Sequence, residues 1–147
     1  MLAAETVSEL VLEPRVAMLS FSNFGDAPHP QSLKVAAAVA LVKARRPELM
    51  IDGEMQANVA LDEDARAPYP FCRLKGPANV LIFPNLDAGN AAYKLLGVIG
   101  DGDVIGPIVL GMKKPVNVLQ QGANVDAIVH MTAITVARSI RLVARSK

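Results

Sequence analysis

Short apolar runs alternate with segments of helical periodicity along the chain, and this alternation constrains the fold more than any other feature of the sequence. The apolar runs are VAMLSF (16–21), ELMI (48–51), NVLIF (79–83) and VIGPIVLG (104–111). Runs this short and this apolar are typical of strands buried on both faces of a sheet. Because strands separated by helices pair in parallel through right-handed crossovers, the sequence predicts an α/β fold. We expect a layered, mostly parallel sheet with helices on both faces.

Three helices are expected between and after these strands. Residues 31–45 form the first, residues 86–98 the second, with Asp87 placed to cap its first turn, and the third begins near Asn124. The first apolar stripe is rich in small side chains, which suits a helix that lies flat on a sheet. The three stripes are Leu33, Ala36, Ala37, Ala40, Leu41 and Ala44; Ala88, Ala91, Ala92, Leu95 and Leu96; and Val125, Val129, Thr132, Val136, Ile140 and Val143.

Composition and charge exclude several classes of partner. The chain has 147 residues, 52% of them hydrophobic, which fits one globular domain of ordinary size. Its 15 basic and 14 acidic residues create no basic field, so nucleic acid and anionic lipid are not expected as partners. The apolar run at 35–42 has eight residues, whereas a membrane span takes about twenty. We therefore expect no membrane association.

Cysteine and aromatic content indicate a compartment and a mode of assembly. The only cysteine, Cys72, cannot form an internal disulfide, and the start MLAAETVSEL lacks the order of a secretory signal. Both features favour a cytoplasmic protein. Four Phe, two Tyr and no Trp supply little aromatic mass, so the core depends on close helix–sheet packing or on burial against another subunit.

Two groups of polar residues lie in loops expected at the carboxyl ends of the strands, where ligands bind in such sheets. SFSNFGDAPHP holds Ser20, Ser22 and His29. A Ser–His pair suggests a nucleophile, but no G-x-S-x-G elbow is present, and the serines more plausibly satisfy loop backbone. Asp52 and Glu54 follow a predicted strand. Their position fits an acid/base pair or metal ligands, but two carboxylates at such a junction more often form a turn and cap a helix.

Metal and dinucleotide sites find little support. His29, His130, Cys72 and the loop acids show no metal-ligand spacing, so we expect no metal. The glycines at 100, 102 and 106 surround Asp101 and Asp103 in a hairpin-like turn that enters a strand. Without a helix directly behind them, they do not form a dinucleotide-binding fingerprint.

Long ordered motifs identify a family resemblance that covers nearly the whole chain. The runs EPRVAMLSFS (13–22), RRPELMIDGEMQANVAL (45–61), GPANVLIFPNLDAGNAAYKLL (76–96), GPIVLGMKKPVN (106–117) and DAIVHMTAITVA (126–137) resemble the second half of the phosphate acetyl/butyryltransferase, or phosphotransacetylase, family. The same module forms the C-terminal domain of bacterial NADP-dependent malic enzymes. The resemblance implies a fold like isocitrate and isopropylmalate dehydrogenases, two α/β domains around a cleft, usually dimeric. Residues 1–147 would be the C-terminal half of the family unit, with residues 112–147 crossing back to the other subdomain.

The family's reactive groups are absent from the matching positions. In active members KPVN is followed by Asp-Leu-Ser-Arg-Gly, and here the first four of these positions read Val118, Leu119, Gln120 and Gln121. A further family aspartate aligns with Ala127, leaving Asp126 about 100° away around the helix, and the phosphate-holding arginine falls near Val98. In the mechanism usually drawn for the family, the aspartate that aligns with Ala127 takes the proton of the CoA thiol. The serine and arginine of the Asp-Leu-Ser-Arg-Gly motif stabilise the oxyanion. We therefore predict no catalytic residue.

Binding is expected to survive these replacements, because backbone amides, helix N-termini and lysines can hold the nucleotide and pantetheine of an acyl-CoA. The residues that remain available for acetyl-CoA or CoA are Tyr93, Lys94, Lys113, Lys114, Gln120, Gln121 and Gly122. Simple exposure to solvent, without any ligand, explains the presence of these lysines about equally well.

Two functions remain open after the resemblance is taken into account. The first is a catalytically silent, acetyl-CoA-sensing regulatory and oligomerisation module of a malic enzyme. The alternative is an active phosphate acyltransferase that moves an acyl group between CoA and phosphate. Whether the chain is itself an enzyme is thus left open, while a homodimer or higher oligomer and an acyl-CoA partner are expected in both cases.

Overall fold

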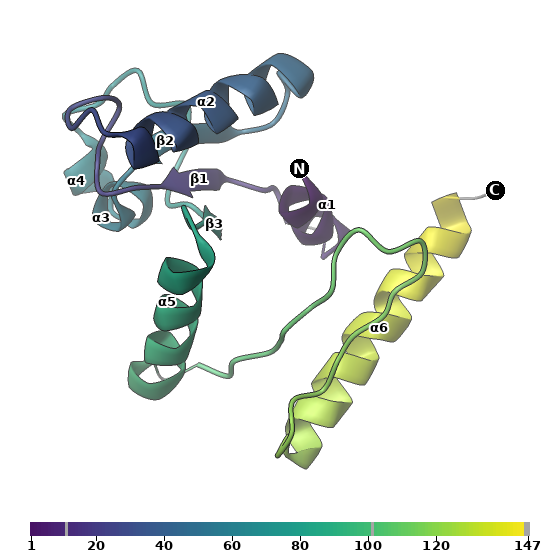
Figure 1. Cartoon of the computed structure of the whole chain (residues 1–147). Helices are drawn as coiled ribbons and strands as arrows, with labels where there is room; N and C mark the ends of the chain where they lie inside the picture. The colour runs from purple at the N-terminus through teal and green to yellow at the C-terminus, as the bar shows by residue number, and fades with distance from the viewer. Residues whose placement is uncertain (11, 101, 146–147) are drawn as a thin grey trace. The chain divides into compact units, whose positions relative to one another are not determined.

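The computed structural model describes residues 1–10, 12–100 and 102–145. Asp101 of the glycine-rich turn lies outside the described residues. The chain divides into two compact units, one formed by Ala3–Leu96 with Met1 and the other by Gly97–Lys147 with Leu2, and each is described by itself. The elements in chain order are α1 (Leu2–Glu9), β1 (Val16–Leu19), α2 (Pro30–Arg45), β2 (Ile51–Met55), α3 (Ala57–Leu61), α4 (Glu63–Arg66), β3 (Val80–Ile82), α5 (Leu86–Ile99) and α6 (Val125–Arg145) (Figure 1).

The first unit contains a parallel sheet in the order β2-β1-β3. Val16 of the central strand is level with Ile51 on one side and Val80 on the other. Side chains alternate between the two faces: one face packs with α1 and α2 through Val16, Ile51 and Val80, and the opposite face packs with α3 through Ala17 and Met55 (Figure 1). The predicted α/β fold, with a parallel sheet and helices on both faces, is confirmed.

The prediction of a fourth strand at 104–111 was wrong. Within the described residues, this segment forms only an isolated antiparallel bridge between Ile108 and Asn117. Pro107 supplies no N–H to a ladder, and Gly106 has a φ of +153°, so the run is interrupted at its centre. The predicted strand at 48–51 also begins later, at Ile51, and continues through Asp52 and Glu54 to Met55.

The predicted stripe of α2 faces the wrong way. Leu33 and Leu41 are 56% and 59% exposed, while Val35 and Val39 are buried against the sheet. Helical spacing permits both faces, because α2 is apolar on two sides. The larger, β-branched side chains fill the space above the sheet better than the alanines of the predicted stripe.

The predicted start of the last helix agrees with the structure, whereas the predicted cap of the 86–98 helix was wrong. Asn124 caps α6, since its side-chain oxygen accepts a hydrogen bond from the amide of Ala127 at 2.8 Å. The cap of α5 is Asn85, whose oxygen accepts from the amide of Ala88 at 2.9 Å, rather than Asp87. Asp87 lies within the first turn, where its charge suits the helix dipole.

Helix α6 packs through the face opposite to its predicted apolar stripe. Met131 is buried and the Thr135 hydroxyl accepts a hydrogen bond from Asn117, whereas Val129, Val136 and Ile140 are exposed. Among the described residues, Val125–Ala144 has the length and mean hydropathy of a membrane-crossing helix, with 6% of that stretch buried. A single helix of this kind is weak evidence for a membrane span, and its one-sided apolar stripe is typical of a helix that covers an apolar surface.

Candidate functional site

The loop that follows β1 is held by the buried carboxylate of Glu54. Oε1 of Glu54 accepts from the Ser22 hydroxyl at 2.9 Å and from the Gly25 amide at 2.6 Å. Both Ser22 and Glu54 are almost completely buried. This carboxylate therefore ties together the carboxyl ends of two neighbouring strands and has a structural role, as buried polar groups with satisfied partners usually do.

The Ser–His pair considered from the sequence is not assembled. The Ser22 hydroxyl lies 3.0 Å from Asp26 as well as beside Glu54. His29 instead caps α2, because its Nδ1 accepts a hydrogen bond from the Gln31 amide at 3.2 Å. Ser20 accepts weakly from the Ser22 amide at 3.4 Å. These contacts agree with the reading in which the serines satisfy loop backbone.

Asp26 also lies in this loop, and hydrogen bonds from the loop hold its carboxylate. Its Oδ1 accepts from the Asn23 amide at 2.7 Å and lies 3.0 Å from the Ser22 hydroxyl. The hydrogen bond from the Asn23 backbone, more than any other contact, lowers the pKa of the Asp26 carboxyl below its ordinary value. The loop thus favours the charged form of this side chain.

Asp52 is a buried ion-pair partner inside β2 and not a helix cap. Its Oδ1 lies 2.5 Å from Lys43 Nζ on α2, and its Oδ2 accepts from the Arg73 amide at 2.7 Å. Glu54 is hydrogen-bonded to the β1–α2 loop instead, so the two acids do not form an acid/base pair. The turn-and-cap interpretation was also wrong, because both residues lie inside β2. Among the described residues, no group of three or more His, Cys, Asp or Glu is placed to hold a metal ion.

Three aromatic rings pack together beside this loop, an arrangement that was not predicted from the sequence. Phe24, at a φ of +51°, packs against Tyr69 at 5.1 Å and against Phe71 at 5.0 Å between ring centroids. Phe24 and Tyr69 are 45 positions apart in the chain, so no local pattern could bring them together. The only signal was the concentration of aromatic residues at positions 69–71 in a chain with few of them.

The turn expected to contact acyl-CoA lies in the second unit. Lys113, Lys114, Gln120, Gln121 and Gly122 are all exposed. The turn is closed by a hydrogen bond from the Ala123 amide to the Gln120 carbonyl at 3.1 Å, and the φ of +85° at position 122 favours glycine. The start of α6 follows directly behind this turn.

Asn117 anchors the segment that leads into the turn. Its side chain accepts from the Val109 amide at 3.2 Å and donates to the Thr135 hydroxyl of α6 at 2.7 Å. Arg138 of the same helix donates to the Val109 carbonyl at 3.1 Å. The KPVN motif marks this asparagine in the sequence, but its anchoring role depends on contacts with Val109 and Thr135 that only the structure shows.

The remaining predicted residues are placed as follows. Tyr93 and Lys94 lie on α5 in the first unit, with Lys94 Nζ 5.1 Å from the centre of the Tyr93 ring. Val98 is 84% exposed near the end of α5, and the amide of Ala127 is bound by the cap of α6. Because Tyr93 and Lys94 belong to the first unit and the turn to the second, their convergence on one ligand stays a prediction.

Comparisons with known proteins agree on one family. The model of the phosphate acetyl/butaryl transferase family matches residues 1–136. The NADP-dependent malic enzyme of Escherichia coli K12 is 47% identical over 141 residues, which are 95% of this chain and 19% of that protein. The phosphate acetyltransferase of Bacillus subtilis 168 is 41% identical over 139 residues, which are 94% of this chain and 43% of that protein.

Solved structures give the same result. A phosphotransacetylase from Streptococcus pyogenes superposes with a TM-score of 0.87 at 38% identity, covering 95% of this chain and 43% of that one. The EutD phosphotransacetylase from Staphylococcus aureus superposes with a TM-score of 0.85 at 37% identity, covering 93% and 43%. The chain therefore spans less than half the length of these relatives.

Proposed function

The chain belongs to the phosphate acetyl/butaryl transferase family, and from this premise we propose that it binds acyl-CoA without transferring the acyl group, as the acetyl-CoA-sensing and oligomerisation module of a malic enzyme. A phosphotransacetylase-like domain of this kind is found both in phosphate acetyltransferases and in NADP-dependent malic enzymes. We also propose that the whole protein is a malic enzyme located in the cytoplasm. Residues 112–147 would cross to another subdomain of the family unit.

The observation that carries the proposal is an ordered turn without reactive groups. Gln120 and Gln121 stand exposed in a turn closed by backbone hydrogen bonding. A glutamine amide can donate to an oxyanion, but loss of a charge-assisted donor costs about 3 kcal/mol. Loss of a general base at Ala127 removes roughly another 10²- to 10⁴-fold in rate. Little acyl transfer would remain.

Binding depends on other groups, and these are accessible. Lys113 and Lys114 are exposed in the segment that precedes the turn, and Lys94 is exposed on α5. Ammonium groups and the backbone amides near Gly122 suit the phosphates of CoA. We assign acetyl-CoA or CoA to Tyr93, Lys94, Lys113, Lys114, Gln120, Gln121 and Gly122.

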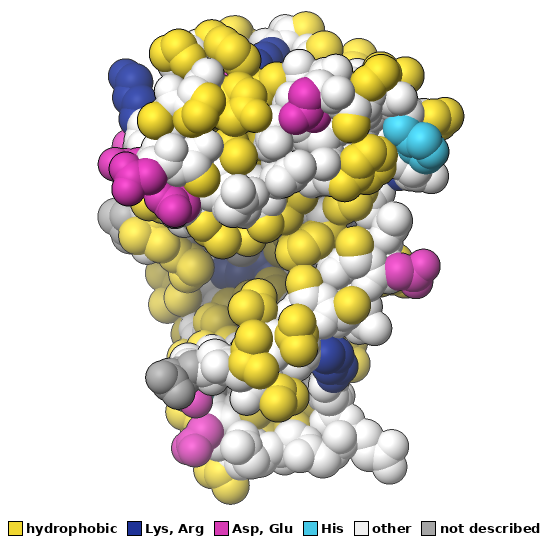
Figure 2. Space-filling view, turned by 90° about the vertical axis from the view of Figure 1, so that its left-hand side faces the viewer, with side chains coloured by type: hydrophobic (Ala, Val, Ile, Leu, Met, Phe, Trp, Pro, Cys, Tyr) yellow, Lys and Arg dark blue, Asp and Glu magenta, His cyan; other side chains and the backbone are white. Residues whose placement is uncertain are grey.

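Exposed apolar helix faces support the oligomerisation half of the proposal. Leu41 on α2, Leu95 on α5 and Val136 on α6 are each more than half exposed, and hydrophobic side chains cover much of the surface seen in Figure 2. Apolar surface on this scale usually marks an interaction site. Acetyl-CoA would regulate a parent enzyme by preferring one of two arrangements of the oligomer, and a preference of about 1 to 3 kcal/mol gives about a 5- to 150-fold change in affinity.

The proposal is tested by measuring binding and turnover separately in the complete protein. We expect acetyl-CoA to bind with micromolar affinity in calorimetry, while no acetyl phosphate forms from acetyl-CoA and phosphate. The quadruple variant Val98→Arg, Gln120→Ser, Gln121→Arg and Ala127→Asp restores the family's reactive groups without changing the surrounding structure. It tests whether loss of these groups explains the absence of acyl transfer. Appreciable transfer by the unmodified protein would instead support an active phosphate acyltransferase. Absence of acyl-CoA binding in both forms would rule out a sensor.

A further inference from the structure

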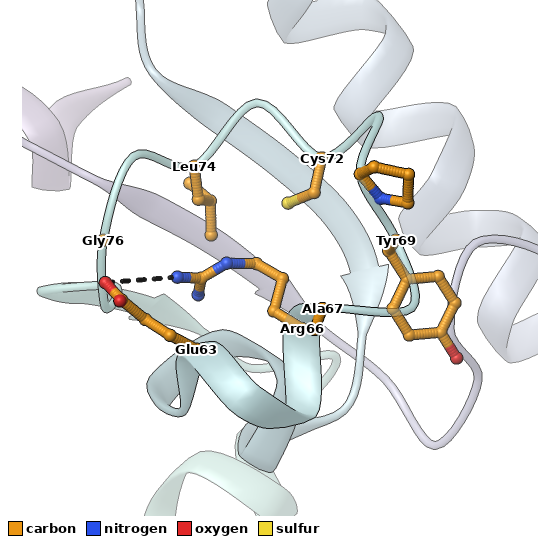
Figure 3. Close-up of a pocket in the computed structure, with 8 residues that line it drawn as sticks. Glu63, Arg66, Ala67, Tyr69, Cys72, Leu74 and Gly76 are labelled. Carbon is orange, nitrogen blue, oxygen red and sulfur yellow. Dashed lines mark ion pairs between the residues drawn. The ribbon is translucent and has the colours of Figure 1, made fainter.

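A pocket of about 330 Å³ opens between α4 and the segment 69–76 of the first unit (Figure 3). This volume falls at the lower end of the range of small-molecule sites, roughly 300 to 1,000 Å³. None of its lining residues belongs to the proposed acyl-CoA contacts. The pocket is therefore a feature that the proposed function leaves unexplained.

A fixed guanidinium lies along the pocket. Arg66 is 8% exposed, and its Nη1 donates to the carbonyls of Val59 at 3.2 Å and Ala60 at 3.4 Å in the last turn of α3. In Figure 3 the guanidinium extends between Leu74 and Glu63. Its Nη2 meets Glu63 Oε1 at 3.8 Å, which is longer than a hydrogen bond. One edge of the guanidinium is thus anchored, and the other is loosely satisfied.

Glu63 occupies the position where an external carboxylate would bind Arg66. Its side chain is 67% exposed, so water can replace it at little cost. Arg15 also lies near Gly76, but its Nε donates to the Pro77 carbonyl at 2.6 Å. Arg66 is therefore the guanidinium that lines the pocket, and the exposed Glu63 carboxylate is the group that an anionic ligand would replace.

The opposite end of the pocket is apolar. Tyr69 closes it, with its ring supported by Phe24 at 5.1 Å, and Cys72 and Leu74 line the wall between Tyr69 and Glu63 (Figure 3). Burial raises the pKa of the Cys72 thiol, which keeps this wall uncharged at neutral pH. A flat apolar group would lie against Tyr69.

We propose that this pocket is a second binding site, which takes a small organic carboxylate with a flat apolar part. The ligand carboxylate would displace Glu63 and accept hydrogen bonds from the planar edge of Arg66, a geometry that guanidinium and carboxylate share. The apolar part would contact Tyr69. Since Tyr69 packs on Phe24 of the β1–α2 loop, an occupied pocket would also restrain that loop.

The test uses benzoate as the probe and benzamide, its uncharged counterpart, as the control. We expect saturable calorimetric binding of benzoate in the millimolar range and at least about tenfold weaker binding of benzamide, corresponding to about 1.4 kcal/mol. Cys72 is the only cysteine in the sequence, so its rate of alkylation by iodoacetamide reports occupancy. Benzoate should slow this reaction, and benzamide at the same concentration should not.

A variant of Glu63 makes the test specific to the proposed geometry. Glu63→Gln removes the competing carboxylate without touching the anchored edge of Arg66, and should strengthen benzoate binding about two- to fivefold, the span expected of an exposed ion pair. Asp103→Asn makes the same change of charge in the other unit and should leave binding unchanged. Equal binding of benzamide, weaker binding in Glu63→Gln, or no saturable binding in either protein would each overturn the proposal.

Discussion

At the residue scale, Gly53 occupies a point in β2 where the neighbouring strand leaves no room for a side chain. Its φ is +133°, and a Cβ would lie 2.5 Å from the Met18 carbonyl oxygen. The pairing register of β1 and β2 shifts directly after Met18. A strained backbone angle and an overpacked contact would act together. Gly53 is therefore needed for the register that places Glu54 under the β1–α2 loop.

We expect Gly53→Ala to lower the free energy of unfolding by about 3 kcal/mol, combining left-handed strain with overpacking. Urea denaturation followed by circular dichroism measures the change. Gly102→Ala is the matched control, because nothing lies within 4 Å of a Cβ at that position, and it should change stability by less than about 0.5 kcal/mol. Equal effects of both substitutions would contradict the role assigned to Gly53.

The lowered pKa of Asp26 predicts that the fold loses part of its stability at low pH. The Asn23 amide, and to a lesser degree the Ser22 hydroxyl, hold the pKa of Asp26 below its ordinary value. A carboxyl whose folded-state pKa is depressed contributes stability that is fully present above its unfolded-state pKa and is lost as pH falls through its folded-state pKa. We expect Asp26→Asn to flatten the acid side of the stability profile measured by thermal unfolding, relative to Asp103→Asn. Identical acid limbs in the two variants would contradict this.

At the element scale, α2 separates a buried face from an exposed one with side chains of the same class. Val39 is 3% exposed and Leu41 is 59% exposed, although both are aliphatic and only two positions apart. Val39→Ala should destabilise the fold by about 2 kcal/mol, through lost burial and a cavity. Leu41→Ala should cost less than about 0.5 kcal/mol when chemical denaturation is measured at a concentration where the chain is monomeric. The reverse order would mean that the sequence-based stripe describes the packed face after all.

At the scale of the whole molecule, the unpacked helix faces predict self-association. Val136 and Ile140 of α6 are 52% and 65% exposed, and a glutamate at either position would have to be desolvated in an interface. We expect sedimentation velocity to detect a dimer or larger oligomer of the unmodified chain, and Val136→Glu with Ile140→Glu to weaken it by at least about tenfold. Lys75→Glu, at an exposed site of the other unit, is the control. A well-folded monomer at high micromolar concentration would contradict the prediction.

Local sequence patterns by themselves determined the class of fold, the approximate extents of the main helices and the family. The run 16–21, the period of 31–45 and the asparagine at 124 each depend on neighbours within about four positions, so their interpretation needed no distant contact. The absence of charge at Gln120, Gln121 and Ala127 is likewise readable directly from the sequence, once the surrounding motif is matched.

Tertiary structure alone decided which face of α2 packs, why Asp52 and Glu54 are structural, and where a pocket opens around Arg66. These outcomes depend on pairs such as Ser22 with Glu54 and Phe24 with Tyr69, which are brought together by strand pairing. A helix with two apolar sides has no internal reason to prefer one of them. The preference arises only when the pleated face of Val16 and Ile51 selects the side chains that fill it.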